Sequence, residues 1–250
     1  MNNAEYYHFA DFTLGNYRRL LGLAREKYPF CTYQDFEPDR RFLIWRHDVD
    51  YSPRAARMMA QIEAEEEVRA TYFVLLHSEY YNLLDQEATA CIREILALGH
   101  DVGLHFDCHY YKINNFEQLA AMLQREQRIL TEIYGQEPRA FSFHNPTPAI
   151  LAFSDWQYAG LINAYADYFR TQVGYCSDSN GYWRFRRLEN VLQEEKEARL
   201  QVLTHPEVWS ETVQSPKERI YRCIDAQAHR LKISYDQLLK KAGRDIVDWD

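Results

Sequence analysis

Several features that would place a chain outside the cytoplasm are missing from this sequence. Its five cysteines are scattered, odd in number and without a CxxC pair, which argues against a disulfide scaffold. No stretch of about 18 uncharged apolar residues occurs, so we expect no membrane span. The first residues lack a basic start followed by an apolar run, the pattern of a secretion signal. Together these absences predict a cytoplasmic protein.

Basic clusters and linkers are also missing. The 29 Lys and Arg residues face 37 Asp and Glu residues, for a net charge of −8, and nucleic acid is therefore not an expected partner. Without low-complexity segments or repeats, residues 1–250 are predicted to form a single domain, with an N-terminal helical extension (1–38) and C-terminal helices (215–250). Aromatic residues make up 15% of the chain and suit both a core and a carbohydrate-binding surface. The oligomeric state is left open.

Apolar runs alternate with helical patterns along most of the chain. Strands are predicted at 41–45, 70–76, 101–106, 139–144, 161–164, 172–176 and 200–205. Helices are predicted at 13–27, from Ser52 and Pro53 onward, and at 86–98, 115–134 and 215–231. This alternation is typical of parallel βαβ units.

Polar side chains follow four of these predicted strands. They are His47, Asp48 and Asp50 after the first strand, His105 and His109 after the third, His144 after the fourth and His205 after the last. Functional residues of parallel α/β folds gather at the carboxyl ends of the strands. The sequence therefore predicts one site that combines these residues.

The aspartates and histidines have the spacing of a metal site. Asp48 and Asp50 face the same side of a strand, where two carboxylates need a cation or a shared proton; the alternative is that one of them caps the following helix. His105 and His109 can both reach one metal, and Asp50 would complete a His/His/Asp set. Such a set suits zinc, with cobalt, nickel or iron as alternatives. Cys108 is expected to be a small buried residue instead of a ligand.

Two further residues have a chemical and a structural interpretation. His205, held after a strand and before Pro206, could act as a general acid, or it could be a satisfied buried histidine. Asp178 could orient a catalytic group, or it could form an Asx-turn ahead of Gly181.

In their order, these motifs resemble those of the polysaccharide deacetylases, the NodB-homology carbohydrate esterases, over about residues 40–210. The motifs are RHDVD (46–50), GHDVGLHFDCH (99–109), FSFHNP (141–146), SDSNGYW (177–183) and LTHPEVW (203–209). The DxD form of the first motif is similar to that of a divergent branch associated with bacterial surface polysaccharides. The third motif departs from the family pattern, because the arginine expected near its proline is not at its usual place.

The resemblance implies an α/β fold, a distorted (β/α) barrel of about seven parallel strands with flanking helices. It also implies roles for particular residues: Asp48 as general base, His205 as general acid, Asp50, His105 and His109 as metal ligands, and His144, Asn145, Leu203, Trp183 and Asp178 as substrate-binding residues. Within that last group, Leu203 would line a pocket for the acetyl methyl group.

The implied activity is metal-dependent removal of an acetyl group, foremost an N-acetyl group, from a sugar or polysaccharide. The expected partner is an N-acetylated sugar, a nucleotide sugar or an oligosaccharide, and the expected cofactor is a divalent metal, foremost zinc. Two alternatives stay open. One is a metal-dependent hydrolase of a small non-sugar amide C–N bond, and the other is a carbohydrate-binding protein without activity.

Overall fold

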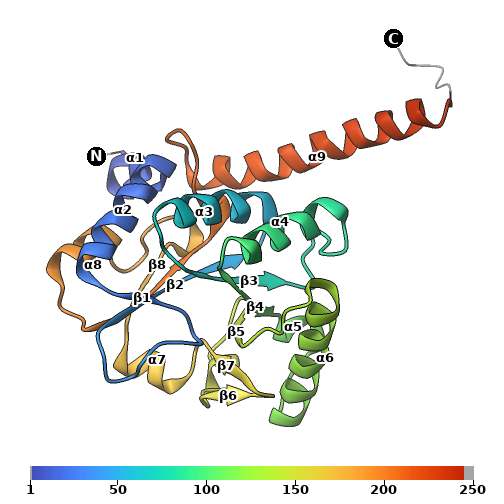
Figure 1. Cartoon of the computed structure of the whole chain (residues 1–250). Helices are drawn as coiled ribbons and strands as arrows, with labels where there is room; N and C mark the ends of the chain where they lie inside the picture. Colours follow the sequence, from blue (N-terminus) through green and yellow to red (C-terminus); the bar gives the residue numbers. More distant parts are fainter. Residues whose placement is uncertain (1, 245–250) are drawn as a thin grey trace.

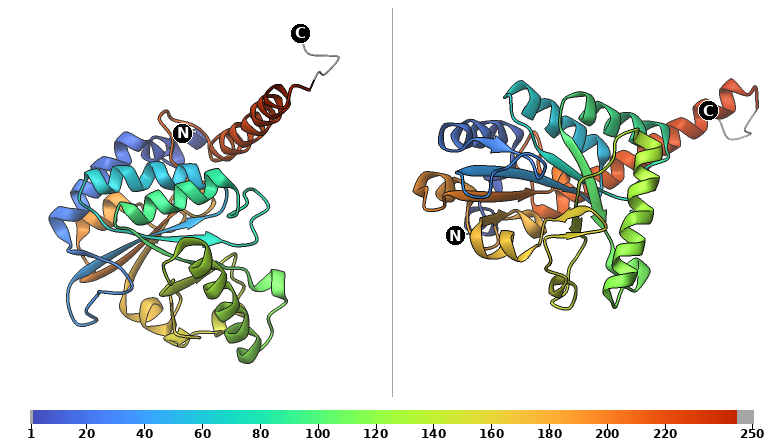
Figure 2. Two further views of the ribbon diagram at one scale, coloured as in Figure 1. Left: turned by 45° about the vertical axis from the view of Figure 1, so that its right-hand side comes forward. Right: turned by 60° about the horizontal axis from the view of Figure 1, so that its bottom comes forward.

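The computed structural model describes residues 2–244, and its centre is a curled, mostly parallel β-sheet (Figures 1 and 2). Eight strands follow one another in the order β6-β7-β5-β4-β3-β2-β9-β8, and a ninth, β1, pairs with β2. Their bounds are β1 Phe30–Cys31, β2 Phe42–Val49, β3 Thr71–Leu75, β4 Asp101–Phe106, β5 Ala140–Phe143, β6 Gln157–Tyr158, β7 Leu161–Asn163, β8 Gly174–Ser177 and β9 Arg199–Thr204. The predicted α/β class and distorted barrel are confirmed. Two short strands, β1 and β6, were not predicted, and β6 pairs antiparallel with β7.

Helices surround the curled sheet, except the last, which projects away from it (Figure 1). They are α1 Asn3–Tyr6, α2 Leu14–Lys27, α3 Pro53–Glu65, α4 Gln86–Ala97, α5 Cys108–Tyr111, α6 Phe116–Tyr134, α7 Asp167–Gln172, α8 Leu188–Glu194 and α9 Pro216–Lys241, with 3-10 turns η1 Phe9–Phe12, η2 Ile150–Ala152, η3 Ser179–Gly181 and η4 Pro206–Val208. The predicted caps are present: the Thr13 and Ser52 side chains accept hydrogen bonds at the starts of α2 and α3, and Gly135 ends α6 at φ 74°. Helix α9 runs to Lys241, beyond the predicted end near Leu231.

The central strands are buried on both faces, and alternate side chains enter two different cores. On β2, Leu43 and Trp45 join the core between the sheet and the outer helices. Phe42 and Ile44 join a smaller core on the concave face of the sheet. Because strand side chains alternate with a period of two, Arg46 and Asp48 continue the concave face. This alternation brings the polar end of β2 into the half-barrel.

The first 38 residues contribute to the sheet as well as adding helices. Helix α2 buries Leu14, Tyr17, Leu20, Leu21 and Ala24. After it, β1 pairs with the first half of β2, through Phe30 opposite Leu43. Among residues 2–244, no helix is long and apolar enough to cross a membrane.

Candidate metal centre and active site

A cavity of about 780 Å³ opens at the carboxyl ends of the central strands. Five of the seven polar residues predicted at strand ends line it: Asp48 and Asp50 from the end of β2, His105 from β4, His144 after β5 and His205 after β9. Parallel strands place these residues together, although up to 157 positions separate them in the sequence. The other two, His47 and His109, are not part of the cavity lining.

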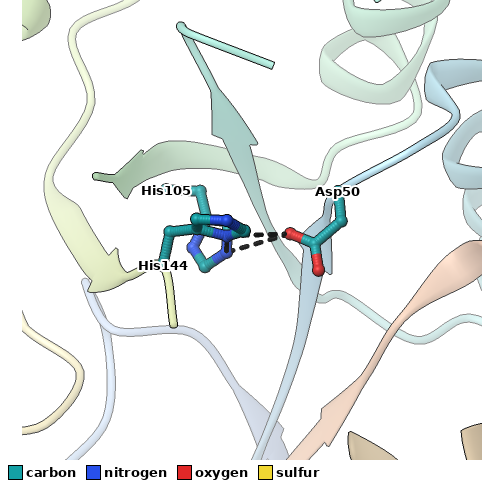
Figure 3. Close-up of side chains that lie close together, drawn as sticks. All are labelled: Asp50, His105 and His144. Carbon is teal, nitrogen blue, oxygen red and sulfur yellow. Dashed lines mark hydrogen bonds and ion pairs between the residues drawn. The ribbon is translucent and has the colours of Figure 1, made fainter. Parts of the chain in front are cut away.

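Three of these side chains converge on one point (Figure 3). His105 Nε2 lies 3.1 Å and His144 Nδ1 lies 3.4 Å from Asp50 Oδ1. The two imidazole nitrogens are 3.2 Å apart. Bonds of roughly 2.0–2.2 Å to a tetrahedral zinc ion hold donor atoms roughly 3.3–3.6 Å apart. The three donors are therefore spaced closely enough for one metal ion.

Hydrogen bonding around the three donors also suits a cation. Ser142 Oγ donates to Asp48 Oδ1 at 3.2 Å and lies 2.7 Å from His105 Nδ1, so it accepts the proton of that nitrogen. His105 Nε2 is then left with a lone pair that faces Asp50. Asp50 Oδ1 is itself buried and receives no hydrogen bond within residues 2–244. A lone pair beside an unpartnered carboxylate oxygen is the environment that a metal ion would satisfy.

Charge reinforces this interpretation of Asp50. Burial raises the pKa of its carboxyl group, and protonated His105, His144 and His205 lower it by more, so the net shift is downward; a metal ion bound by the histidine lone pairs would supply this positive charge in their place. Asp50 is thus held in its ionised form, the form that binds metals.

The structure differs from the sequence prediction at His109. It does not bring His109 into the donor group; His144 stands there instead. His109 Nε2 lies 3.1 Å from the backbone oxygen of Asn145. The chain changes from strand to helix at Asp107, whose side chain caps α5, so His105 and His109 do not share one helical face. The HxxxH spacing was therefore a poor guide to which second histidine joins the group.

Asp48 is more deeply buried than Asp50, and the buried Arg46 guanidinium contacts it from the interior of the half-barrel. Arg46 Nη2 lies 3.4 Å from Asp48 Oδ2 and donates to the Tyr165 hydroxyl at 3.0 Å. Burial lowers the pKa of the Arg46 guanidinium, and Asp48 together with neighbouring tyrosines raises it by more, so Arg46 remains charged. Arg46 thus supplies the positive charge next to Asp48, from the strand that carries Asp48 itself. Sequence reasoning missed this role, although the i, i+2 spacing is visible in RHDVD.

His205 is fixed from behind by Asp178. Its Nδ1 lies 2.6 Å from Asp178 Oδ1, and its backbone N–H donates to the same carboxylate. Trp209 Nε1 donates to Asp178 Oδ2 at 3.1 Å. Burial lowers the pKa of His205, but the carboxylates of Asp178, Asp50 and Asp48 together raise it by more, to about 10. His205 is therefore a protonated imidazole whose Nε2 lies 3.9 Å from Asp50 Oδ2.

The remaining predicted binding residues divide into two groups. Asn145 and Leu203 line the cavity. Asp178 is fully buried beneath His205 and positions it instead of facing the cavity. Trp183 is also away from the cavity: its ring packs on Phe12, and its Nε1 donates to Asp11 at 3.0 Å. The Trp183 side chain is used in the core beneath the N-terminal segment, so the structure does not place it where it would bind substrate.

Other cavity residues were not singled out from the sequence. The Tyr51 and Tyr80 rings contact each other at a tilt of 51°, with centroids 4.4 Å apart, and His77 stacks on Tyr110 with centroids 3.7 Å apart. All four line the cavity, which gives its mouth two aromatic surfaces. Glu207 lines it as well, fully buried, and both of its carboxylate oxygens lack a hydrogen-bond partner within the described chain. Burial, and then the charge of Asp50, raise the pKa of Glu207 well above its ordinary range.

Comparison with known proteins finds solved structures that align with this chain at low sequence identity. No family model matches it. No curated protein matches it either. Among solved structures, the peptidoglycan deacetylase PdaC from Bacillus subtilis aligns with 14% identity, over 83% of this chain and 98% of that one, with a TM-score of 0.45.

Two further solved structures align similarly. For the chitin deacetylase from Colletotrichum lindemuthianum, the identity is 16%, the coverage 75% of this chain and 83% of that one, and the TM-score 0.45. For a family 4 acetyl xylan esterase from Clostridium thermocellum in complex with cobalt, the identity is 16% and the TM-score is 0.42. The alignment covers 81% of this chain and 92% of that one. At these similarities the chemistry of this chain has to be argued from its own residues.

Proposed function

We propose that this protein is a metal-dependent hydrolase that removes an acetyl group from an N-acetylated sugar. One observation carries the proposal: Asp50, His105 and His144 converge within 4.8 Å of one another, in a cavity that also holds an aspartate and a protonated histidine. A bound divalent metal, with zinc as the first choice, would polarise the acetyl carbonyl and lower the pKa of a water molecule. His144 replaces His109 in the ligand set that we propose.

Asp48 has the position of a general base. Its carboxylate lines the cavity at the end of β2, two residues before Asp50. It accepts a hydrogen bond from Ser142 at 3.2 Å and lies 3.4 Å from the Arg46 guanidinium, so both contacts hold it in place beside the three donors. In the proposed reaction Asp48 accepts a proton from the attacking water.

His205 has the position and charge of a general acid. Asp178 holds the proton on Nδ1, which leaves the protonated Nε2 free to point toward the reacting group. In the proposed reaction Nε2 donates its proton to the departing sugar nitrogen as the C–N bond breaks, so that acetate and a free amine result. Leu203 lies beside the base on the concave face, opposite Arg46 in the sheet, where it can contact the acetyl methyl group.

The aromatic mouth favours a sugar over a small amide. Tyr80 and Tyr110 are 41% and 59% exposed, which is costly for large aromatic side chains unless a ligand covers them. The C–H face of a pyranose ring packs on such surfaces, and the cavity is large enough for a sugar beyond the acetylated one.

The direct test is acetate release from N-acetylated sugars, nucleotide sugars and oligosaccharides by zinc-loaded protein. We expect acetate and a free amine with N-acetylated substrates, and Asp48→Asn to lower kcat by about 10² to 10⁴-fold with bound zinc unchanged. Glu79→Gln, which removes an exposed cavity carboxylate, is the matched control and should keep its activity. Full activity of Asp48→Asn would refute the role of Asp48 as general base. Ammonia or formate as the product would favour the small-amide alternative. Absence of bound zinc together with absence of turnover would favour the binding-protein alternative.

A further inference from the structure

Helix α9 projects away from the body of the molecule over much of its length (Figures 1 and 2). Its start is anchored: Arg219 is buried and donates to the backbone oxygens of Gly181 and Phe9, and Arg230 forms an ion pair with Glu87 at 2.7 Å. Beyond Arg230, the helix residues are exposed except for the half-buried Leu239. An isolated helix of this kind has little stability of its own in water, so its exposed half needs another partner.

Six exposed apolar residues of α9 follow a heptad repeat, and Ile233, also exposed, lies outside it. Their spacing alternates strictly between three and four positions over three heptads, the a/d pattern of a coiled-coil seam. These residues, which we call the α9 stripe, are Tyr221, Ile224, Ala228, Leu231, Tyr235 and Leu238. Five of them are large, with exposed fractions of 53%, 37%, 61%, 58% and 64% in chain order. A stripe with this period is complementary to another helix of the same kind.

We propose that the α9 stripe binds the α9 stripe of a second copy of this chain, as an antiparallel two-helix coiled coil. In an antiparallel pair, a positions face d positions, and three such layers align in one register: Tyr221 with Leu238, Ala228 with Leu231, and Tyr235 with Ile224 of the second copy. The layer of Ala228 and Leu231 combines a small side chain with a large one, and the other two layers combine two large side chains. The two-fold axis of the pair passes between residues 229 and 230.

Charge selects this register and orientation. Asp225 and Lys232 both occupy e positions next to the stripe, and neither has an ion-pair partner in the described part of the chain. In the antiparallel register, Asp225 lies beside Lys232 of the second copy, and the symmetry repeats this pair. A parallel pair would instead bring Gln227 beside Lys232 and Ser234 beside Leu239, which gives no pair of opposite charges.

The shape of the molecule is compatible with this pairing. Each body lies at the start of its own α9, so an antiparallel pair places the two bodies at opposite ends of the seam (Figure 1). A helix of this length spans about 39 Å, which leaves room for the second helix between them. The end of each α9 would then lie beside Pro216, Lys217 and Ile220 of the other copy, three residues at the rim of the cavity.

The experiment is sedimentation velocity and light scattering on the full chain across a concentration range. We expect a dimer for the unaltered protein and a monomer for the double variant Leu231→Glu/Leu238→Glu. A monomer of the unaltered chain up to about 0.1 mM would overturn the proposal.

Charge reversal tests the orientation without touching the apolar seam. Asp225→Lys and Lys232→Glu should each weaken the dimer at least about tenfold, because each creates two like-charge contacts, and the double variant should restore it. Asp236→Lys makes the same charge change outside the seam and should have no effect. Single variants that leave the dimer unchanged, or a double variant that fails to restore it, would contradict the antiparallel register. Circular dichroism confirms that each variant retains its helix content.

Discussion

At the residue scale, the chemistry of the site depends on what lies behind each functional side chain. His105 has its lone pair aimed at Asp50 because Ser142 accepts the proton on the opposite ring nitrogen. His205 keeps its proton because Asp178 lies behind it. Asp178 and Ser142 do not reach the point where the three donors converge, yet they decide which protonation state faces it.

The choice between two histidines gives the first prediction. We expect His144→Ala to weaken zinc binding by at least about 10 to 100-fold, because it removes one of the three converging donors. His109→Ala should leave the affinity within a few-fold, because His109 contacts the backbone of Asn145 instead. Isothermal titration with zinc measures both variants. If His109→Ala weakens zinc binding more than His144→Ala does, His109 is a zinc ligand and His144 is not.

The second prediction concerns pH. A general acid works only while protonated, so activity that depends on His205 falls as pH rises through its pKa, which is about 10. Asp178→Asn removes the largest of the effects that raise this pKa against burial, while the charges of Asp50 and Asp48 remain. The alkaline limb of kcat/KM should therefore move down from about pH 10 toward the ordinary histidine value of about 6.5. NMR titration of the His205 ring should show the same shift, and an unmoved limb would exclude His205 as the acid.

At the scale of elements, the concave face of the sheet is packed too tightly for extra atoms beneath the site. A Cβ at Gly103 on β4 would lie 2.6 Å from the Phe73 ring and 2.7 Å from the Ala140 backbone oxygen. The Arg46 guanidinium lies over the same Phe73 ring, with its carbon 5.6 Å from the centroid. The position of Arg46, and with it Asp48, thus depends on a glycine in the neighbouring strands.

Gly103→Ala is therefore expected to lower the free energy of unfolding by about 1–3 kcal/mol, because neither the ring nor the strand can yield without a shift. Urea unfolding measures the change, and activity should fall with it as Arg46 moves. Gly22→Ala on α2 is the matched control: no atom lies within 4 Å of its added Cβ, and alanine favours the helix. An unchanged midpoint for Gly103→Ala would contradict the tight packing.

At the scale of the whole molecule, a buried polar network joins elements from the first third of the chain on the outer side of the sheet. Glu63 on α3 accepts hydrogen bonds from Tyr17 on α2 and Tyr72 on β3, both at 2.5 Å. His47 on β2 lies 2.7 Å from the same carboxylate. This network, and not the candidate metal centre, uses the histidine of RHDVD, because His47 points to the opposite face from Asp48.

Removal of the Glu63 charge should destabilise the whole fold. Burial raises the pKa of Glu63, but His47, His100 and Tyr17 lower it by more, so the ionised form is favoured in the folded state. A lowered pKa contributes stability above the unfolded value of about 4.3, and that contribution is lost as the pH falls through the folded pKa. Glu63→Gln should cost about 3–5 kcal/mol at pH 7, and less below pH 4. Guanidinium unfolding at both pH values measures this, and an equal cost at both would argue against the ionised carboxylate.

The sequence by itself determined the alternation of strands and helices, most element bounds, and the rule that polar residues collect at strand ends. These features depend on local periodicity and capping, which act over a few residues, as at Thr13, Ser52 and Gly135. The same local logic suggested His105 with His109, since four positions is a ligand spacing within one helix.

Only the tertiary structure decided which side chains meet. His144, and not His109, joins the donor group because the chain turns from strand to helix at Asp107, while neighbouring strands β4 and β5 bring His105 and His144 together across 39 positions. Ser142 reaches Asp48, and Trp183 enters the core, for the same reason. Sheet register and strand curvature set distances between residues remote in sequence, and neither quantity is written in the spacing of a single motif.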